Sequence, residues 1–205
     1  SELLMKKTKK RKIHPLQVIT HIGAWIPFII LAIDYSNNNL TVNPIQEATL
    51  RTGRTALTLL VLSLACTPIN IIFSYKPVLK LSRPLGVYSF FYALLHFYIF
   101  IGVDYGFNWG FFAEAFLEKR FTLIGGAAFL ILLALAITST DGWKRRLKKN
   151  WKRLHRFVYL AIALVITHFI WSVKSDYRLA LVYGAIALIL LIIRVPVIRK
   201  RILRK

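Results

Sequence analysis

Residues 154–171 read LHRFVYLAIALVITHFIW, an apolar run in which Arg156 carries the only formal charge. A helix needs about 20 predominantly apolar residues to cross the hydrocarbon core of a bilayer. The run therefore predicts a membrane-spanning helix, over 155–173, that carries two histidines, His155 and His168. Ionisable residues inside a membrane are costly, so their presence indicates a function.

Five further stretches of the chain have the same apolar character. Together they predict six spans, at roughly 16–35, 55–73, 84–106, 121–139, 155–173 and 177–195. Hydrophobic residues make up 57% of the 205 residues and charged residues only 18%, against about 25% charged residues in average composition. This balance excludes a disordered chain and disfavours an ordinary soluble enzyme. We predict an all-α membrane protein that folds as a six-transmembrane-helix bundle.

The basic residues are distributed unevenly between the two sides of the predicted bundle. Of 29 Lys and Arg residues, six precede the first span, three lie from Lys76 to Arg83, eight from Lys144 to Arg156 and six from Arg194 on. The other side holds six, together with six of the eight acidic residues. The positive-inside rule then places both termini in the cytoplasm, with basic tails at 1–15 and 196–205. We favour this topological interpretation of the net charge of +21 over nucleic-acid binding.

The predicted connections between spans are short. The longest, roughly 36–54, has about 19 residues, and the others have about 14 or fewer. A nucleotide-binding or substrate domain needs on the order of 100 residues. Any chemistry must therefore take place inside the bundle or on a partner, and we predict no substrate-reducing site of the chain's own.

Three of the five histidines lie at positions suited to a cofactor. His96 is near the middle of the third span, while His155 opens the fifth span and His168 lies deep within it. The third and fifth spans both run outward, so they are parallel, and His96 and His168 reach a similar depth. They are placed to share one haem iron, with His155 roughly 20 Å away along the helix at a separate inner site. Spacing alone equally allows buried histidines hydrogen-bonded between helices.

Helical periodicity does not put His155 and His168 on one face. They are 13 residues apart, which leaves them about 140° from the same direction at 3.6 residues per turn. Of the other histidines, His14 is expected to be solvated, and His21 to snorkel or to pack against a neighbouring helix. The single cysteine, Cys66, excludes an intramolecular disulfide.

Several short stretches, in combination, resemble a known family. They are HIGAWIP at 21–27, TGRTAL at 52–57, TP at 67–68, RPLG at 83–86, ALLH at 93–96, LAITST at 135–140, LHRFVYL at 154–160 and HFIWSVK at 168–174. In them the chain resembles the MsrQ (YedZ) family, the haem-binding membrane subunits of the MsrPQ methionine sulfoxide reductase system. This family lies within the ferric reductase-like transmembrane group. The resemblance implies a single ferric reductase-like transmembrane domain over 1–205 in the bacterial inner membrane.

The resemblance also implies a function. Family members carry electrons through b-type haem from a cytoplasmic NAD(P)H flavin reductase to the periplasmic molybdoenzyme MsrP, which reduces methionine sulfoxide in oxidised envelope proteins. FMN is associated with the family, and the family's haem-linked histidines correspond to His96, His155 and His168. Two alternatives stay open. One is a ferric-chelate or quinone-linked transmembrane reductase, and the other is a cofactor-free membrane transporter or interaction subunit.

The chain departs from the wider ferric reductase group at one position. That group has two histidines on each of two parallel helices, which hold two haems, but Arg83 stands 13 residues before His96. Arginine stays charged, so it is a poor iron ligand and is better suited to a haem propionate or an FMN phosphate. The chain is thus expected to hold one or two haems. The inner site is expected to be a five-coordinate haem on His155, a haem with an unusual partner such as His14 or His21, or a flavin site.

Overall fold

The computed structural model describes residues 14–104, 106–173 and 176–203, and its regular elements in these ranges are all helical. The longer helices are α1 (Pro15–Ser36), α2 (Pro44–Phe73), α3 (Ser82–Tyr98), α5 (Arg120–Ile137), α8 (Val158–Ser172) and α9 (Arg178–Ile193). The shorter ones are η1 (Lys76–Lys80), the π-helical η2 (Ile99–Asp104), α4 (Trp109–Glu118), α6 (Asp141–Leu147), α7 (Lys149–His155) and α10 (Pro196–Leu203). The predicted all-α class is confirmed. Most of the predicted tail at 1–15 lies outside the described residues, as do Lys174 and residues 204–205.

Five helical segments are long and apolar enough to cross a membrane: 15–36, 44–73, 76–103, 120–137 and 149–172. They correspond to five of the six predicted spans. The sixth predicted span, 177–195, contains the shorter α9, whose 16 residues extend about 24 Å at 1.5 Å per residue. The sixth span and the cytoplasmic placement of both termini therefore stay predictions.

Apolar side chains cover the outside of the bundle. On α1, Ile19, Ile22 and Ile33 are 53–64% exposed, and on α9, Leu188 and Ile189 are 59% and 57% exposed. Soluble monomers rarely expose apolar patches that continue along whole helices. Lipid-facing helices need no polar exterior. Together with the five candidate spans, this surface identifies a multi-pass membrane protein.

Helix α2 corrects a predicted boundary. The span predicted at 55–73 begins at Pro44, about three turns earlier, so most of the connection predicted at 36–54 is helical. The helix begins there because the Asn43 side chain accepts a hydrogen bond from the Gln46 N–H at 3.0 Å and proline suits the first turn. The added turns are polar, which is why hydropathy alone did not detect them.

The centre of the bundle is built around α2. One core cluster combines residues of α2, α5, α8 and α9: Leu57, Leu60, Val61, Leu64, Leu132, Ala161, Ile162 and Ala187. A second cluster joins α2 to η1 and α3: Ala56, Leu59, Cys66, Val78, Leu85 and Tyr92. Burial of these side chains sets the distance between α2 and its neighbours, and so fixes the space left for the site.

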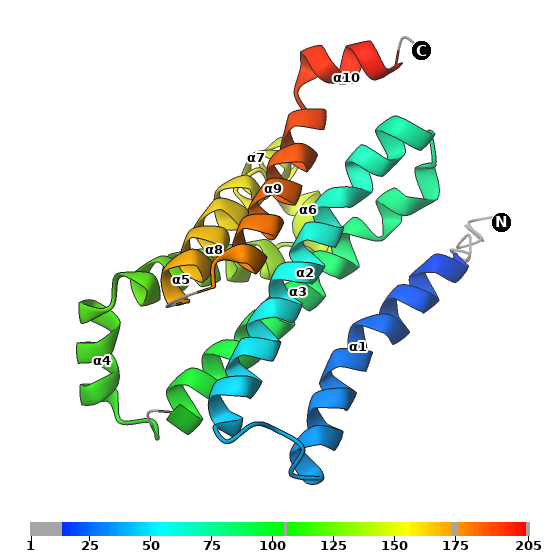
Figure 1. Ribbon diagram of the computed structural model, residues 1–205. Helices are drawn as coiled ribbons and strands as arrows, with labels where there is room; N and C mark the ends of the chain where they lie inside the picture. The colour runs from blue at the N-terminus through cyan, green and yellow to red at the C-terminus, as the bar shows by residue number, and fades with distance from the viewer. Residues whose placement is uncertain (1–13, 105, 174–175, 204–205) are drawn as a thin grey trace, which may run out of the picture.

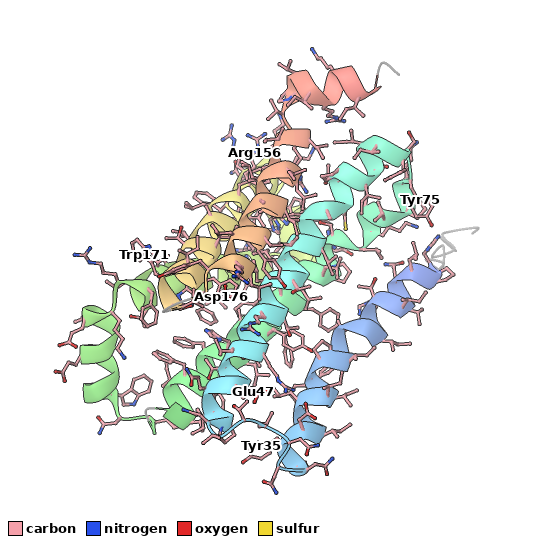
Figure 2. All side chains as sticks on the ribbon, viewed as in Figure 1. Tyr35, Glu47, Tyr75, Arg156, Trp171 and Asp176 are labelled. Carbon is pink, nitrogen blue, oxygen red and sulfur yellow. The ribbon has the colours of Figure 1, made fainter. Side chains whose placement is uncertain are left out.

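Helices α3 and α8 run in the same direction through the bundle (Figure 1). In Figure 2, Tyr75 and Arg156 lie toward one end of the molecule, and Tyr35 and Glu47 toward the other. We call the first the inner end and the second the outer end, following the predicted topology. The parallel arrangement predicted for the third and fifth spans is thus the one that the structure adopts.

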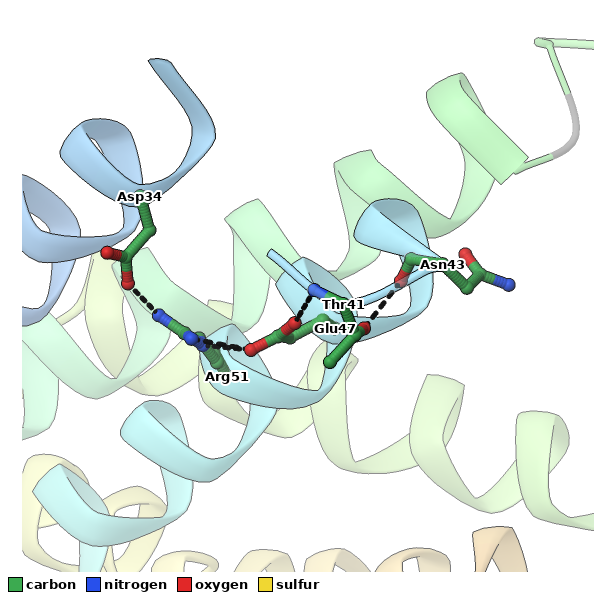
Figure 3. A network of polar contacts seen from close by, with 5 residues as sticks. All are labelled: Asp34, Thr41, Asn43, Glu47 and Arg51. Atoms are coloured by element: carbon green, nitrogen blue, oxygen red, sulfur yellow. Dashed lines mark hydrogen bonds and ion pairs between the residues drawn. The ribbon is translucent and has the colours of Figure 1, made fainter. Parts of the chain in front are cut away.

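A network of polar contacts joins α1 to α2 at the outer end (Figure 3). The Arg51 guanidinium bonds Asp34 at the end of α1 and also Glu47, one turn earlier on α2. Glu47 in turn accepts a hydrogen bond from the Thr41 N–H at 2.5 Å, and the Thr41 hydroxyl donates to the Asn43 carbonyl at 3.4 Å. One arginine therefore holds both helix ends and the connection between them.

Candidate functional site

Two cavities lie inside the bundle, one toward each end. The outer cavity has a volume of about 480 Å³ and is lined by residues of α2, α3, α5 and α8, His96 and His168 among them. The inner cavity has a volume of about 920 Å³, and His155 is among the residues that line it. Leu60 and Leu132 line both, so the two cavities adjoin at the level of these side chains.

His96 and His168 face each other in the outer cavity. Their ring centroids are 6.1 Å apart, and the ring planes lie at 85° to each other. The Nδ1 atom of His96 lies 2.8 Å from the Thr49 carbonyl oxygen, and that of His168 lies 2.7 Å from the Phe121 carbonyl oxygen. A carbonyl only accepts hydrogen bonds, so each Nδ1 carries the proton and donates it. The lone pair of each neutral ring is then on Nε2, the usual ligand atom for a metal.

Two glycines make room for these rings. A Cβ added at Gly53 would lie 3.0 Å from Nδ1 of His96, and one added at Gly125 would lie 2.7 Å from Nδ1 of His168. Any side chain at either position would crowd the imidazole. Sequence reasoning assigned no role to these glycines. For Gly125 the available signal was a glycine inside a predicted span, which often marks a close approach of another group. Gly53 gave no such signal, because it lies in the connection predicted at 36–54.

Cations lie at the margin of the outer cavity. Of the described residues that line it, Arg54 and Lys119 are charged, none is Asp or Glu, and most of the others are apolar. This lining suits a flat apolar ligand with an anionic edge.

His155 occupies a different environment at the inner end. Its ring stacks on Trp151 at 3.9 Å and 26°, and its Nε2 lies 3.2 Å from the Thr138 hydroxyl oxygen. In His155 the Nε2 atom thus contacts the Thr138 hydroxyl, whereas in His96 and His168 the Nε2 atom carries the lone pair that suits a metal. His155 is brought together with neither His96 nor His168.

The helical segment that carries His155 and His168 is locally irregular between the two histidines. Helix α7 ends at His155 and α8 begins at Val158, with a turn between them. Arg156 and Phe157 keep right-handed helical torsion angles and donate to carbonyls three residues earlier, so the segment continues through a tightened turn. Each ring reaches its own cavity.

The two remaining described histidines have local partners. His14 caps α1, its Nδ1 accepting a hydrogen bond from the Leu16 N–H at 3.3 Å. His21 packs edge-on against Tyr88, with its Nδ1 2.9 Å from the tyrosine hydroxyl, and it lines the inner cavity.

Arg83 also lines the inner cavity and has an anionic partner within the protein. Its Nη1 donates to a carboxylate oxygen of Asp141 at 2.6 Å, and its guanidinium lies 5.9 Å from the centre of the Trp151 ring. Sequence reasoning did not anticipate Asp141. It also counted Arg194, a further lining residue of this cavity, only as a topological charge.

Comparisons with known proteins extend this description. Residues 52–166 match the family described as the ferric reductase like transmembrane component. A relative from Xanthomonas axonopodis pv. citri is 38% identical over 181 residues, which cover 85% of this chain and 83% of the relative. A relative from Herminiimonas arsenicoxydans is 38% identical over 177 residues, which cover 85% of this chain and 81% of the relative. A relative from Xanthomonas campestris pv. campestris is 40% identical over 152 residues, which cover 74% of this chain and 70% of the relative.

Each of these relatives is named protein-methionine-sulfoxide reductase heme-binding subunit MsrQ. No solved structure matches the chain. The helical bundle and the matched region define a transmembrane component of the ferric reductase-like type. Because the similarity to the named relatives extends over most of its length, the chain belongs to the MsrQ family. The resemblance inferred from short sequence stretches is confirmed.

Proposed function

We propose that this chain is a haem b-containing electron-transfer subunit of the bacterial inner membrane. The observation that carries the proposal is the outer pair, His96 and His168, whose ring centroids are 6.1 Å apart. One haem iron bound by both imidazoles would be held between these facing rings. The relatives are named as heme-binding subunits, which supports the same assignment.

The surroundings of the pair favour ligation over a structural role. Ligating histidines almost always donate their other ring N–H to a carbonyl or carboxylate, as His96 does to Thr49 and His168 to Phe121. Arg54 at the cavity margin is placed to pair with a haem carboxylate. Bound there, haem would supply a one-electron redox centre. Two histidine ligands would leave a bound haem iron without an open position for oxygen, which suits electron transfer.

The inner cavity is proposed to hold a second cofactor beside His155, either a second haem or FMN. Leu60 and Leu132 separate it from the outer pair. Arg83 is proposed to pair with the anionic group of that cofactor, in exchange for Asp141. The chain would thus carry two redox sites in sequence across the membrane.

The charge distribution supports a direction of electron flow from the inner end to the outer end. The eight Lys and Arg residues from Lys144 to Arg156 would attract an anionic donor to the inner end. We propose a cytoplasmic NAD(P)H flavin reductase as the donor and a periplasmic MsrP-like molybdoenzyme as the acceptor, which receives electrons for the repair of oxidised methionine. The chain itself is proposed to hold no substrate-reducing site.

A spectrum tests this proposal. Protein purified from haem-replete cells should show b-type bands in a reduced-minus-oxidised spectrum, and the outer haem should be lost from both His96→Ala and His168→Ala. His14→Ala is the matched control, since His14 lies outside both cavities. Full haem content in a variant lacking both outer histidines would overturn the assignment. Absence of haem from wild-type protein would favour the cofactor-free transporter or interaction subunit.

The acceptor requires a separate measurement. Reduced protein should be reoxidised by the MsrP-like molybdoenzyme faster than by a ferric chelate or a quinone. The opposite order would favour the ferric-chelate or quinone-linked reductase instead.

A further inference from the structure

Helix α2 contains a proline whose consequence is visible at the inner cavity. Pro68 has no N–H, so the carbonyl of Leu64, one turn earlier, lacks its normal helical donor. Arg194, at the end of α9, supplies one, because its Nη2 donates to the Leu64 carbonyl oxygen at 2.6 Å. Its Nη1 donates to the Tyr159 hydroxyl at 2.9 Å. The guanidinium is therefore held between α2, α8 and α9 in the wall of the inner cavity.

These two neutral partners leave the charge of Arg194 uncompensated. Among the described residues no carboxylate pairs with it, and its Nε is buried without a hydrogen-bond acceptor. A guanidinium has five N–H donors, of which the two hydrogen bonds use two. Charged side chains within membrane bundles pair with an opposite charge or mark a binding pathway. The position of Arg194 thus indicates an anion that is not part of the described chain.

The rest of the inner cavity indicates what kind of anion this is. The described residues of its lining include no Asp or Glu, and the basic ones are Lys80, Arg83, Lys144 and Arg194, with His21 and His155. The aromatic rings of Tyr88, Trp151 and Tyr159 contribute to the same lining. Of the two arginines, Arg83 has the carboxylate of Asp141 as its partner, whereas no carboxylate among the described residues pairs with Arg194. Such a cavity suits a planar aromatic ligand that carries a carboxylate or a phosphate.

We propose that Arg194 anchors the carboxylate or phosphate of a planar aromatic ligand in the inner cavity. Its contacts with Leu64 and Tyr159 fix the guanidinium, so the second N–H groups of Nη1 and Nη2 meet the ligand without further ordering. Because Tyr159 follows His155 by one helical turn, an anchored ligand lies beside His155. This inference deepens the proposed function at its second cofactor site and is independent of the outer histidine pair. The anionic group belongs to either a haem propionate or an FMN phosphate.

The first arm of the test compares FMN with riboflavin, which lacks the phosphate, by quenching of flavin fluorescence on the purified protein. Wild-type protein should bind FMN about tenfold or more tightly than riboflavin, and Arg194→Gln should bind the two alike. Arg199→Gln is the matched control, because it removes the same charge from the same end at an exposed residue that lines neither cavity. Arg199→Gln should keep the wild-type preference.

The second arm measures haem content per chain. If the ligand is haem, Arg194→Gln should lose the same share of haem as His155→Ala, and neither FMN nor riboflavin should bind preferentially to the wild type. A change in flavin binding alone identifies an FMN phosphate as the anionic group, and a change in haem content alone identifies a haem propionate. An Arg194→Gln protein that matches wild type in both arms overturns the proposal.

A second variant separates the loss of the Arg194 charge from a folding defect caused by the unpaired Leu64 carbonyl. In a Pro68→Ala background the residue at position 68 again donates an N–H to the Leu64 carbonyl, so loss of Arg194 no longer leaves that carbonyl without a donor. Pro68→Ala/Arg194→Gln should therefore accumulate normally and show the same loss of anion binding relative to Pro68→Ala alone. The haem of the His96 and His168 pair is a separate readout. Its absence from every variant would refute the proposed function while the flavin arm still decides on Arg194.

Discussion

Gly125 lies so close to His168 that a Cβ added to it would be 2.7 Å from the Nδ1 atom of the histidine. The same Nδ1 donates to the carbonyl of Phe121, one turn before the glycine on α5, at 2.7 Å. A single turn of α5 therefore supplies both the hydrogen-bond acceptor and the space for the ring. This relationship fixes the orientation of His168 before any ligand binds.

Gly125→Ala is expected to displace the imidazole of His168 and weaken the outer haem site. Side-chain carbons essentially never come within 3.0 Å of such an atom, so the ring or α5 must shift, and a misplaced ligand binds its metal more weakly. Haem content per chain and the reduced-minus-oxidised spectrum measure the effect. Gly184→Ala is the control, since its Cβ would meet only Ile166 at an ordinary 3.6 Å. An unchanged haem content and spectrum in Gly125→Ala would show that the ring is free to move.

Gly53→Ala is expected to have the same effect on His96 but to a smaller degree. Here the added Cβ would lie 3.0 Å from Nδ1 and 3.2 Å from Cε1, so a displacement of a few tenths of an ångström relieves the contact. The expected order of haem loss is Gly125→Ala, then Gly53→Ala, then Gly184→Ala, measured in parallel on equally expressed proteins. A reversed order of the first two would contradict the distances.

The pairing of His96 with His168 could be predicted from sequence because it depends on two coarse properties. These are the direction of each span and the depth of each histidine within it, and both follow from hydropathy and charge. The environment of His155 could not be predicted in this way. The turn after α7 is a local irregularity inside an otherwise apolar run, and hydropathy averages over it.

The roles of Gly53, Gly125 and Arg194 were missed for a different reason. A glycine has no side chain to indicate what approaches it. An arginine at the end of a span satisfies the positive-inside rule equally well with or without a partner. Their roles depend on which helices become neighbours. That information appears only in the packed bundle, where Pro68 and Arg194 meet through the Leu64 carbonyl.

Arg51→Met is expected to destabilise the outer end of the bundle. The change leaves the partly buried carboxylates of Asp34 and Glu47 side by side without the cation that joins them, and like charges then repel. The melting temperature should fall by a few degrees, and limited proteolysis should become faster between α1 and α2. Arg178→Met is the control, because its contact with Asp176 is 4.0 Å long and both side chains are largely exposed. Equal melting temperatures for the two variants would mean that the Arg51 network contributes nothing.

Reporter fusions test whether α9 is a sixth span. Alkaline phosphatase inserted at Asp176 should be active, because this position is predicted to be periplasmic, whereas the enzyme fused after Leu203 should be inactive. The reason is the contrast between the six Lys and Arg residues from Arg194 on and the few on the opposite side. A fluorescent protein fused after Leu203 should show the complementary result. Phosphatase activity at both positions would mean that α9 does not cross the membrane.

Arg83→Lys tests whether Arg83 serves the inner cofactor or only the topology of the chain. The change keeps a positive charge at the inner end but loses the planar fork that pairs with a carboxylate or phosphate through two hydrogen bonds. In the structure Arg83 is held by Asp141, whose side chain is 51% exposed, and exposed ion pairs are weak enough to exchange partners. Inner-site occupancy, or its rate of reduction by a cytoplasmic flavin reductase, should therefore fall in Arg83→Lys while the outer haem signal stays intact. Asp141→Asn is the companion variant: it removes the competing partner and should leave occupancy equal to or above that of the wild type. An Arg83→Lys protein that matches the wild type in both occupancy and reduction rate would restrict Arg83 to its ion pair and its topological charge.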